Sequence, residues 1–241
     1  MIDIIQSRQN PLIKERIKLH QKKYRDKTGQ FLVEGKRLVE EAIKSKNLLE
    51  VFVDEDFIVS EQNSEMLLSL KKNRISCYQV EADLFKTLAE TESPQGIVGV
   101  AKKEIFSLQQ LKINSGLILI TDGLQDPGNL GAVLRTAWAT GVDALFCLSG
   151  TVDPYNGKTV RSSMGGIFHV PIINNVEWSV LRKWCRKLEF QLIAGDLRAS
   201  VSHFDFTYKE RTALIVGNEA QGLLTVNLND VDEMVKIPLT E

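Results

Sequence analysis

The fold of the second half of this chain is decided by the stretch Asp126-Pro127-Gly128-Asn129-Leu130-Gly131-Ala132-Val133-Leu134-Arg135-Thr136. It follows an apolar run at residues 117–120 and precedes a second apolar run at residues 142–148. This order of apolar run, glycine-containing turn, helical spacing and apolar run predicts a strand–helix–strand unit of a parallel sheet. Ligands of such sheets gather at the carboxyl ends of the strands, so we expect a binding site beside this turn.

Two common phosphate-binding loops do not fit the turn. A Walker loop requires Lys and then Ser or Thr directly after its second glycine, whereas Asn129 and Leu130 follow the pair Gly123 and Gly128. The dinucleotide fingerprint requires three glycines, and only Gly128 and Gly131 match it. The turn therefore argues against a P-loop nucleotide hydrolase and against a nicotinamide or flavin enzyme.

Arg135 is the residue of this stretch that local structure does not explain. The predicted buried face of the helix consists of Leu130, Leu134 and Trp138. Arg135 lies off that face, with small residues one turn before and one turn after it, so a ligand could approach its guanidinium closely. The alternative is a contact with a neighbouring helix, with Arg135 solvated and Asn129 acting only as an N-cap.

Charge is distributed unevenly along the 241 residues, although the formal net charge is only −1. Eight of the first 27 residues are Lys or Arg and three are Asp or Glu, so this segment carries a net charge of plus five. A basic segment on an otherwise neutral protein predicts a polyanion docked at one end. The alternative is a solvated helix face.

Cysteine and histidine usage argues against a disulfide framework and against a zinc site. The chain has three Cys (Cys77, Cys147 and Cys185) and three His, all widely spaced. No apolar stretch reaches membrane-spanning length, and the amino terminus lacks the pattern of a secretory signal. We expect a soluble cytoplasmic protein that binds neither a metal nor a membrane.

The periodicity predicts two domains, at residues 1–105 and 116–241, joined by a polar linker at residues 106–115. The first domain is predicted to contain a basic helix from Asn10-Pro11 to just before Gly29, strands at 31–33, 49–53, 76–80 and 96–101, and helices at 36–44, 65–71 and 82–90. The second is predicted to add strands at 172–173, 191–194 and 213–216, with a helix from Trp178 to Leu188.

Two further segments are candidate parts of a site. The loop at residues 217–222, which is followed by Leu223, has glycine at both ends, Gly217 and Gly222, and these allow a sharp turn. Its Glu219 would lie near the N-terminal end of a following helical turn, where a carboxylate is electrostatically favoured. Lys158 and Arg161 lie three residues apart on one face of a predicted helix, where they could hold a phosphate. Both patterns also occur in ordinary structural loops and surface helices.

Taken together, the loops resemble a known family. Residues 120–135, residues 217–223 and the stretch Val235-Lys236-Ile237-Pro238-Leu239 resemble the three ordered motifs of the SpoU (TrmH-type) branch of the SPOUT RNA methyltransferases. The stretches Ser7-Arg8-Gln9-Asn10-Pro11, Phe31-Leu32-Val33-Glu34-Gly35 and Ser93-Pro94-Gln95-Gly96 resemble the substrate-binding domain that often precedes the catalytic domain. The resemblance covers nearly the whole chain.

The resemblance implies transfer of a methyl group from S-adenosylmethionine to a ribose 2′-hydroxyl of structured RNA, usually ribosomal RNA. It implies a homodimer with a small amino-terminal α/β RNA-binding domain and a carboxy-terminal parallel-sheet α/β domain that contains a trefoil knot. By position, the implied catalytic residues are Asn129, Arg135 and Glu219, and the implied cofactor-binding residues are Gly217, Ile237 and Leu239.

The basic residues are predicted to bind the RNA, mainly through its phosphates. The predicted RNA-binding residues are Arg8, Lys14, Lys18, Lys22, Lys23, Arg25, Lys158 and Arg161. A locally charged helix offers affinity but little base recognition, so we expect sequence choice to come from RNA shape and unstacked loops.

The end of the sequence departs from the family pattern. Members normally continue past the Ile-Pro-Leu stretch with a Ser-Leu-Asn-containing loop and a final helix, whereas this sequence stops at Glu241. If Glu241 is the true terminus, we expect an incomplete knot and, as the alternative function, a non-catalytic RNA-binding or ribosome-associated protein.

Overall fold

The computed structural model describes residues 3–113 and 115–238, and the chain forms two compact units. The first unit contains Met1–Lys103 and Tyr155–His169, and the second contains Glu104–Pro154 and Val170–Glu241. Residues 155–169, which we predicted within the second domain, therefore pack with the first unit.

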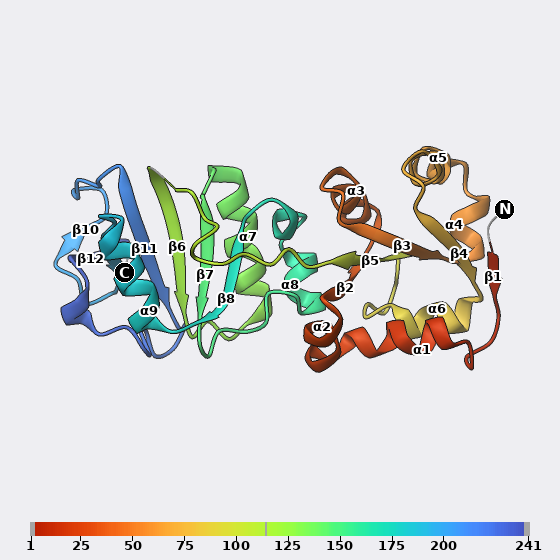
Figure 1. Cartoon of the computed structure of the whole chain (residues 1–241), viewed down its shortest axis with the longest axis horizontal. Coiled ribbons are helices and arrows are strands. Elements are labelled where there is room, and N and C mark those ends of the chain that lie inside the picture. Colours follow the sequence, from red (N-terminus) through yellow and green to blue (C-terminus); the bar gives the residue numbers. More distant parts are fainter. Residues whose placement is uncertain (1–2, 114, 239–241) are drawn as a thin grey trace. The chain divides into compact units, whose positions relative to one another are not determined.

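A five-stranded mixed sheet, in the order β1-β4-β3-β5-β2, forms the centre of the first unit (Figure 1). Its strands are β1 (Asp3–Ile5), β2 (Gln30–Glu34), β3 (Leu48–Val53), β4 (Ser76–Val80) and β5 (Ile97–Lys102). β4 pairs in parallel with β1 and β3, and β5 pairs antiparallel with β3 and β2. The four predicted strands are confirmed. β1 was not predicted, because three residues with one buried side chain are too few to show the alternation of apolar and polar residues that marks a strand.

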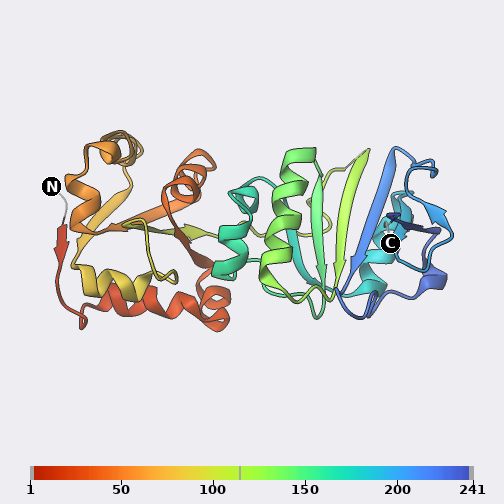
Figure 2. The same cartoon turned by 180° about the vertical axis from the view of Figure 1, so that it is seen from behind.

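Helices cover both faces of this sheet, with α1 and α6 on one face and α3 and α5 on the other (Figures 1 and 2). The helices of the first unit are α1 (Pro11–Ile17), α2 (Lys22–Thr28), α3 (Lys36–Lys44), α4 (Glu55–Val59), α5 (Ser64–Lys72), α6 (Ala82–Leu88) and α8 (Gly157–Ser162). Short 3₁₀ turns are η1 (Lys18–His20), η2 (Glu61–Asn63) and η3 (Gly166–Phe168). α4 was not predicted, because five residues are too few to show a helical period.

The prediction of one continuous basic helix is wrong. The helix is interrupted by η1 and by Gln21, whose backbone is extended (φ −94°, ψ 130°). The Arg25 guanidinium donates hydrogen bonds to the carbonyl oxygens of Leu19 and His20 at 2.9 and 2.7 Å. These bonds satisfy carbonyls that the interruption leaves without helical partners. The predicted ends are confirmed, since Asn10 caps α1 and Gly29 ends α2 with φ 65°.

The second unit has a seven-stranded sheet in the order β10-β12-β9-β11-β6-β7-β8, and every pair is parallel. Its strands are β6 (Gly116–Asp122), β7 (Ala144–Leu148), β8 (Ile172–Val176), β9 (Gln191–Gly195), β10 (Val201–Ser202), β11 (Arg211–Gly217) and β12 (Glu233–Lys236). The predicted parallel α/β sheet is confirmed. β10 and β12 were not predicted, because they are two and four residues long.

Two long helices cover opposite faces of this sheet (Figures 1 and 2). α7 (Pro127–Thr140) connects β6 to β7, and α9 (Trp178–Lys187) connects β8 back across the sheet to β9. Right-handed crossovers in opposite directions place their helices on opposite faces. Leu181 and Cys185 of α9 pack on alternate strand residues such as Ile120 and Ile215. A 3₁₀ turn, η4 (Leu228–Asp230), precedes β12.

None of the helices in residues 3–113 and 115–238 is long and apolar enough to cross a membrane. Within the same residues, no group of three or more His, Cys, Asp or Glu side chains is placed to hold a metal ion.

Candidate active site

The carboxyl ends of β6 and β11 lie side by side in the sheet of the second unit. The strands are parallel and in register, with Asp122 opposite Gly217. The chain leaves β6 toward β7 on one side and leaves β11 toward β12 on the other. Connections that diverge from neighbouring strands leave a crevice outside their carboxyl ends, where α/β proteins bind ligands. The predicted binding edge is therefore a topological switch point.

The turn between β6 and α7 ends in a capped helix start. The Asp126 carboxylate accepts a hydrogen bond from the Asn129 N–H at 2.9 Å, and Pro127 lies in the first turn, where no N–H is needed. Asp126 is therefore the N-cap, and the alternative that Asn129 is only an N-cap is wrong. The Asn129 side chain remains free for another role.

A hydrogen bond joins Asn129 to Glu219 across the switch point. Asn129 Nδ2 donates to Glu219 Oε1 at 2.9 Å, and both residues are exposed. This bond is the main reason that the pKa of Glu219 lies below its ordinary value. Glu219 is therefore ionised at neutral pH, and its carboxylate orients the Asn129 amide. The structure thus brings together two of the three predicted catalytic residues.

The loop after β11 is closed on itself by backbone and amide hydrogen bonds. Asn218 N donates to Gly222 O at 2.7 Å, and Gly222 N donates back to Asn218 O at 3.0 Å. Asn218 Nδ2 donates to Gly123 O at 2.9 Å, which ties the loop to the turn after β6. A Cβ at Gly217 would lie 2.4 Å from the Gly222 backbone. Only glycine fits at Gly217, so this residue has a structural role beside its predicted cofactor contact.

Asp122 is a buried carboxylate that our sequence reasoning missed. It is 0% exposed, and its Oδ2 accepts N–H bonds from Leu224, Thr225 and Val226 at 2.8, 2.8 and 2.9 Å. The Thr225 hydroxyl donates to Oδ1 at 2.6 Å. A buried carboxylate is tolerated because these four donors replace its hydration. The available signal was an Asp at the end of an otherwise apolar strand.

Arg135 lies on α7 with an exposed side chain. It makes no hydrogen bond or ion pair with any residue that the structure describes. An exposed guanidinium without a protein partner can receive a phosphate or a developing negative charge. Its predicted catalytic role therefore stays a prediction, since the structure does not join it to Asn129 and Glu219.

A cavity of about 290 Å³ opens at the carboxyl ends of β9, β11 and β12. Its walls include Gly195, Leu197, Val216 and Ile237. Ile237 is a predicted cofactor-binding residue, and Gly217 directly follows Val216. Our sequence reasoning missed residues 195–197, because a single Gly after a short strand is not a distinctive pattern. Leu239, the third predicted cofactor-binding residue, lies outside the described residues.

Most of the predicted RNA-binding residues in the first unit are exposed. These are Arg8, Lys14, Lys18, Lys22 and Lys23. Some of them have weak local partners, such as Lys22, whose ammonium lies 3.0 Å from Asp26 in an exposed i,i+4 pair. Such pairs contribute little and are readily exchanged for phosphate. Their predicted contact with RNA stays a prediction.

Arg25 is a correction to the predicted RNA-binding set. Its side chain is buried, with 4% of the residue exposed, and the guanidinium donates to the Leu19 and His20 carbonyls. A buried guanidinium that donates to backbone carbonyls is not available to a phosphate. Arg25 therefore stabilises the interruption between α1 and α2.

Arg161 is already bound by carboxylates of the first unit, and its predicted contact with RNA stays a prediction. Arg161 Nη1 lies 2.9 Å from Glu90 and 3.4 Å from Glu34. His20 Nδ1 lies 3.1 Å from the other Glu90 oxygen. The His20 hydrogen bond and then Arg161 lower the pKa of Glu90 to about 2, and the same Glu90 bond raises the pKa of His20. Arg161 thus holds α8 within the first unit, whereas Lys158 remains exposed.

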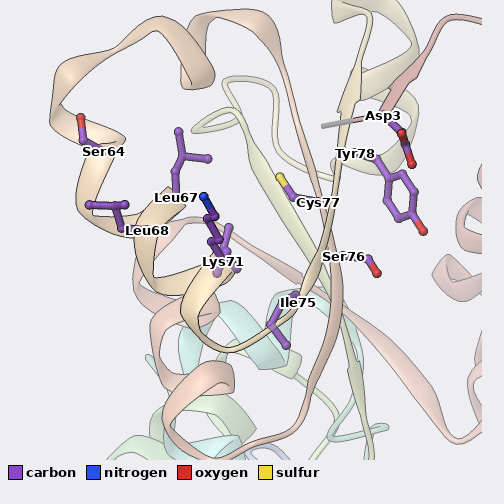
Figure 3. A pocket seen from close by; sticks show the side chains of 10 residues that line it. Asp3, Ser64, Leu67, Leu68, Lys71, Ile75, Ser76, Cys77 and Tyr78 are labelled. Carbon is purple, nitrogen blue, oxygen red and sulfur yellow. The ribbon is translucent and has the colours of Figure 1, made fainter. Parts of the chain in front are cut away.

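A larger cavity of about 750 Å³ lies between α5 and β4 in the first unit (Figure 3). Leu67 and Lys71 lie on the side of α5 that faces Cys77 and Ile75. Burial raises the pKa of the Cys77 thiol to about 11. The thiol is therefore protonated at neutral pH and is a poor nucleophile, so this cavity has no catalytic group of that kind.

The parallel sheet, the switch-point loops and the polar pair define an α/β protein with a candidate ligand site at the carboxyl edge of its sheet. The SpoU rRNA Methylase family model matches residues 116–241, and the model of the MRM3-like substrate binding domain matches residues 10–99. The chain belongs to the SpoU rRNA methylase family.

Two relatives and one solved structure resemble most of the chain. The 23S rRNA (guanosine(2553)-2′-O)-methyltransferase RlmP of Bacillus subtilis is 37% identical over 98% of this chain and 90% of its own length. The human mitochondrial rRNA methyltransferase 3 is 34% identical over 66% of this chain and 38% of its own length. An AdoMet-bound rRNA methyltransferase from Sinorhizobium meliloti has a TM-score of 0.86 at 26% identity, covering 100% of this chain and 90% of that chain.

These comparisons confirm the predicted family, the α/β fold class, the class of enzyme and the cofactor. The predicted trefoil knot, the homodimer and the individual site residues stay predictions.

Proposed function

We propose that this protein transfers a methyl group from S-adenosylmethionine to a ribose 2′-hydroxyl of ribosomal RNA. The observation that carries the proposal is the hydrogen bond between Asn129 and Glu219 at the switch point of the sheet. It joins the two loops that resemble family motifs, and those loops follow adjacent strands. The family of the chain and the names of its relatives support the same reaction.

The cavity at the ends of β9, β11 and β12 fits the proposed cofactor. The apolar side chains of Leu197, Val216 and Ile237 suit a flat adenine ring, and the backbone beside Gly195 offers hydrogen-bonding groups at the strand end. When bound, S-adenosylmethionine supplies an electrophilic methyl group. The residues of the chain then need only orient the ribose hydroxyl and stabilise the charge that develops on it.

Arg135 is proposed to act by electrostatics. A ribose hydroxyl loses its proton as it attacks the methyl group, yet an Arg side chain stays protonated at all accessible pH values. An exposed guanidinium without a protein partner among the described residues is suited to hold an RNA phosphate and to stabilise the developing alkoxide. Asn129, oriented by Glu219, is proposed to position the hydroxyl through its free Oδ1.

The exposed basic residues of α1, η1 and α2 are proposed to hold the RNA backbone. Lys14, Lys18, Lys22 and Lys23 are exposed, and this part of the chain lies within the match to a substrate-binding domain. Contacts of this kind release counterions, so RNA affinity should fall steeply with salt.

We also propose a homodimer in the cytoplasm. Leu197 and Ile237 line the cavity and are 74% and 66% exposed, and exposed apolar side chains of this kind favour association. The three thiols are unpaired, and two of them are buried, which suits a reducing compartment. Light scattering tests the proposed dimer, and imaging of a tagged protein in cells tests the proposed location.

The reaction is tested by incubating the purified protein with ribosomal RNA transcripts and S-adenosylmethionine that carries an isotopically labelled methyl group. We expect label on ribose, measured by mass spectrometry of the nucleosides after digestion. Label on a base, or no label on any ribosomal transcript, would exclude the proposed reaction.

A further inference from the structure

A third cavity, of about 480 Å³, lies in the first unit where three loops meet. Lys36 begins α3 after the turn from β2, Asp56 lies in the first turn of α4 after β3, and Gln95 lies in the loop before β5. Two of these loops carry the stretches around Gly35 and Gln95 that the sequence analysis singled out. Neither stretch has a part in the proposed methyl transfer.

The cavity is shaped by two glycines that no other residue could replace without strain. Gly35 has φ +98° and Gly96 has φ +74°, which are conformations that favour glycine. A Cβ at Gly35 would lie 3.0 Å from Gln95 Oε1, and a Cβ at Gly96 would lie 2.7 Å from Asp54 Oδ1. The backbone is therefore closely packed around the Gln95 and Asp54 side chains.

The Gln95 amide is held in one orientation. Its Oε1 accepts the Lys36 backbone N–H at 3.1 Å, while backbone bonds from Gly35 to Ile97 and from Asp54 to Gly96 hold the loops together at 3.0 and 3.1 Å. Because Oε1 is engaged, the Nε2 of Gln95 remains available as a donor. A fixed donor is thus presented at the wall of the cavity.

Further polar groups line the wall, and the Asp56 carboxylate, which is exposed, has no ion-pair partner among the described residues. Asn63 is 4% exposed, and its Nδ2 donates to Phe57 O at 2.8 Å, whereas its buried Oδ1 has no hydrogen-bond partner among the described residues. Lys36 Nζ lies 5.7 Å from the centre of the Phe57 ring. Donors and acceptors therefore lie together in one cavity.

The charges of these groups disfavour the simplest ligands. The carboxylates of Asp54 and Asp56 repel a phosphate, and the Lys36 ammonium repels a metal cation. A neutral planar group with both donors and acceptors satisfies all of them. An unstacked nucleobase is such a group, and RNA-binding domains commonly read splayed-out bases along their Watson–Crick edges.

We propose that this cavity binds an unstacked guanine of the RNA substrate. Guanine places two N–H donors, at N1 and N2, next to its O6 acceptor. A carboxylate matches the two donors, so Asp56 accepts from N1–H and N2–H, while Lys36 and Gln95 donate to O6. The proposal rests on the proposed function only in taking RNA as the substrate.

The test compares two matched pairs of variants. Asp56→Asn and Glu55→Gln each remove one negative charge from the start of α4, but only Asp56 lines the cavity. Lys36→Gln and Arg37→Gln each remove one positive charge from the start of α3, and only Lys36 lines the cavity. The probes are uridine decamers with one central guanine, inosine or adenine, which share length and charge. Affinity is measured by fluorescence anisotropy with the full chain.

We expect the wild-type protein to bind the guanine decamer about tenfold more tightly than the inosine decamer, because inosine lacks the N2 amine and its charge-assisted hydrogen bond. Asp56→Asn should abolish that difference, whereas Glu55→Gln should retain it. Lys36→Gln should weaken guanine binding more than Arg37→Gln does. Thermal unfolding of each variant verifies that it is folded.

Equal wild-type affinity for the three decamers, or equal behaviour of Asp56→Asn and Glu55→Gln, would overturn the proposal. Absence of measurable wild-type binding would do the same, and so would preferential Mn²⁺ broadening of the NMR signals of residues 54–57, which would indicate a cation site. Because no step uses S-adenosylmethionine, failure of methyl transfer leaves the result of this test intact.

Discussion

In two regions of the molecule, a tightly packed glycine turn holds an amide side chain. The two regions differ in how many hydrogen-bonding groups of that amide have partners within the protein. At the end of β11, Gly217 allows Asn218 to use both its amide oxygen and its amide nitrogen within the protein. At the start of α3, beside Gly35, the Gln95 amide oxygen accepts a hydrogen bond from the Lys36 backbone, while the Gln95 amide nitrogen remains available as a donor. The first region is internally complete, whereas the second retains unused donors and acceptors.

This difference separates a scaffold from a recognition surface. Asp122 has four donors inside the protein, so its loops are held in place before any ligand arrives. The exposed Asp56 carboxylate has no ion-pair partner among the described residues and can acquire a hydrogen-bond donor from a ligand. A catalytic edge benefits from fixed geometry, and a recognition pocket benefits from unused polar groups.

Removal of the Arg135 guanidinium should have the largest effect. Arg135→Ala should lower methyl transfer by about 10²- to 10³-fold, because one electrostatic stabiliser of the developing charge is lost. Affinity for S-adenosylmethionine, measured by calorimetry, should stay nearly unchanged. Lys187→Ala, which removes an exposed cation from α9, serves as the control and should retain activity. Normal turnover by Arg135→Ala would refute the assigned role.

Disruption of the Asp122 cluster should have the next largest effect, this time on stability. Asp122→Asn places an NH₂ group or a weaker acceptor against backbone N–H donors in a site that is 0% exposed. We expect a loss of about 3 kcal/mol in the free energy of unfolding, measured with urea. Asp205→Asn changes an exposed Asp of the same unit and should cost little. Equal stabilities would show that the second unit is not held by this carboxylate.

Loss of the bond between Asn129 and Glu219 should have a smaller effect. Asn129→Ala should lower turnover by about tenfold, the value of one charge-assisted hydrogen bond. The pKa of Glu219 should rise toward its ordinary value, because its main stabilising partner is gone. NMR titration of the Glu219 carboxyl measures this change, with the exposed Asn73→Ala as control. An unshifted titration curve would contradict the proposed coupling.

The smallest predicted effect concerns the pH dependence of the cluster that holds α8. The pKa of Glu90 is lowered from 4.5 to about 2. The ionised Glu90 therefore stabilises the folded state above pH 4.5, and this contribution is lost as the pH falls toward 2. The pKa of His20 is raised from 6.5, so its stabilisation is present below pH 6.5 and is lost as the pH rises through the folded value. The cluster should therefore stabilise the protein most between about pH 4.5 and 6.5.

Urea unfolding at several pH values measures this dependence. His20→Asn should remove the loss of stability above pH 6.5 that the raised pKa produces, whereas His203→Asn should retain it. A pH profile that is identical in both variants would show that the pair of His20 and Glu90 contributes nothing measurable.

Much of the fold could be predicted, because its elements show clear local patterns. The apolar runs at residues 117–120 and 142–148 became β6 and β7, and the helix predicted at residues 36–44 became α3 with the same bounds. Short elements such as β1 and α4 escaped prediction, because a few residues at an edge show no period.

The candidate site was predictable only in part. Asn129 and Glu219 were predicted as catalytic residues because their loops resemble family motifs. Their hydrogen bond could not be predicted, because it joins residues 90 positions apart and depends on the pairing of β6 with β11. Asp122 was missed because the strand pattern indicates burial without indicating which donors surround a carboxylate. Arg25 was assigned wrongly, because a charge count does not show which cation points inward.

The sequence by itself determined the parallel α/β unit, the positions of the glycine turns and the family resemblance, since these depend on local periodicity and on short motifs. Only the tertiary structure decided that residues 155–169 belong to the first unit, that Arg161 binds Glu90, and that three loops enclose a cavity around Gln95. The physical reason is that burial and hydrogen-bond partners are set by contacts between distant segments, which no local pattern specifies.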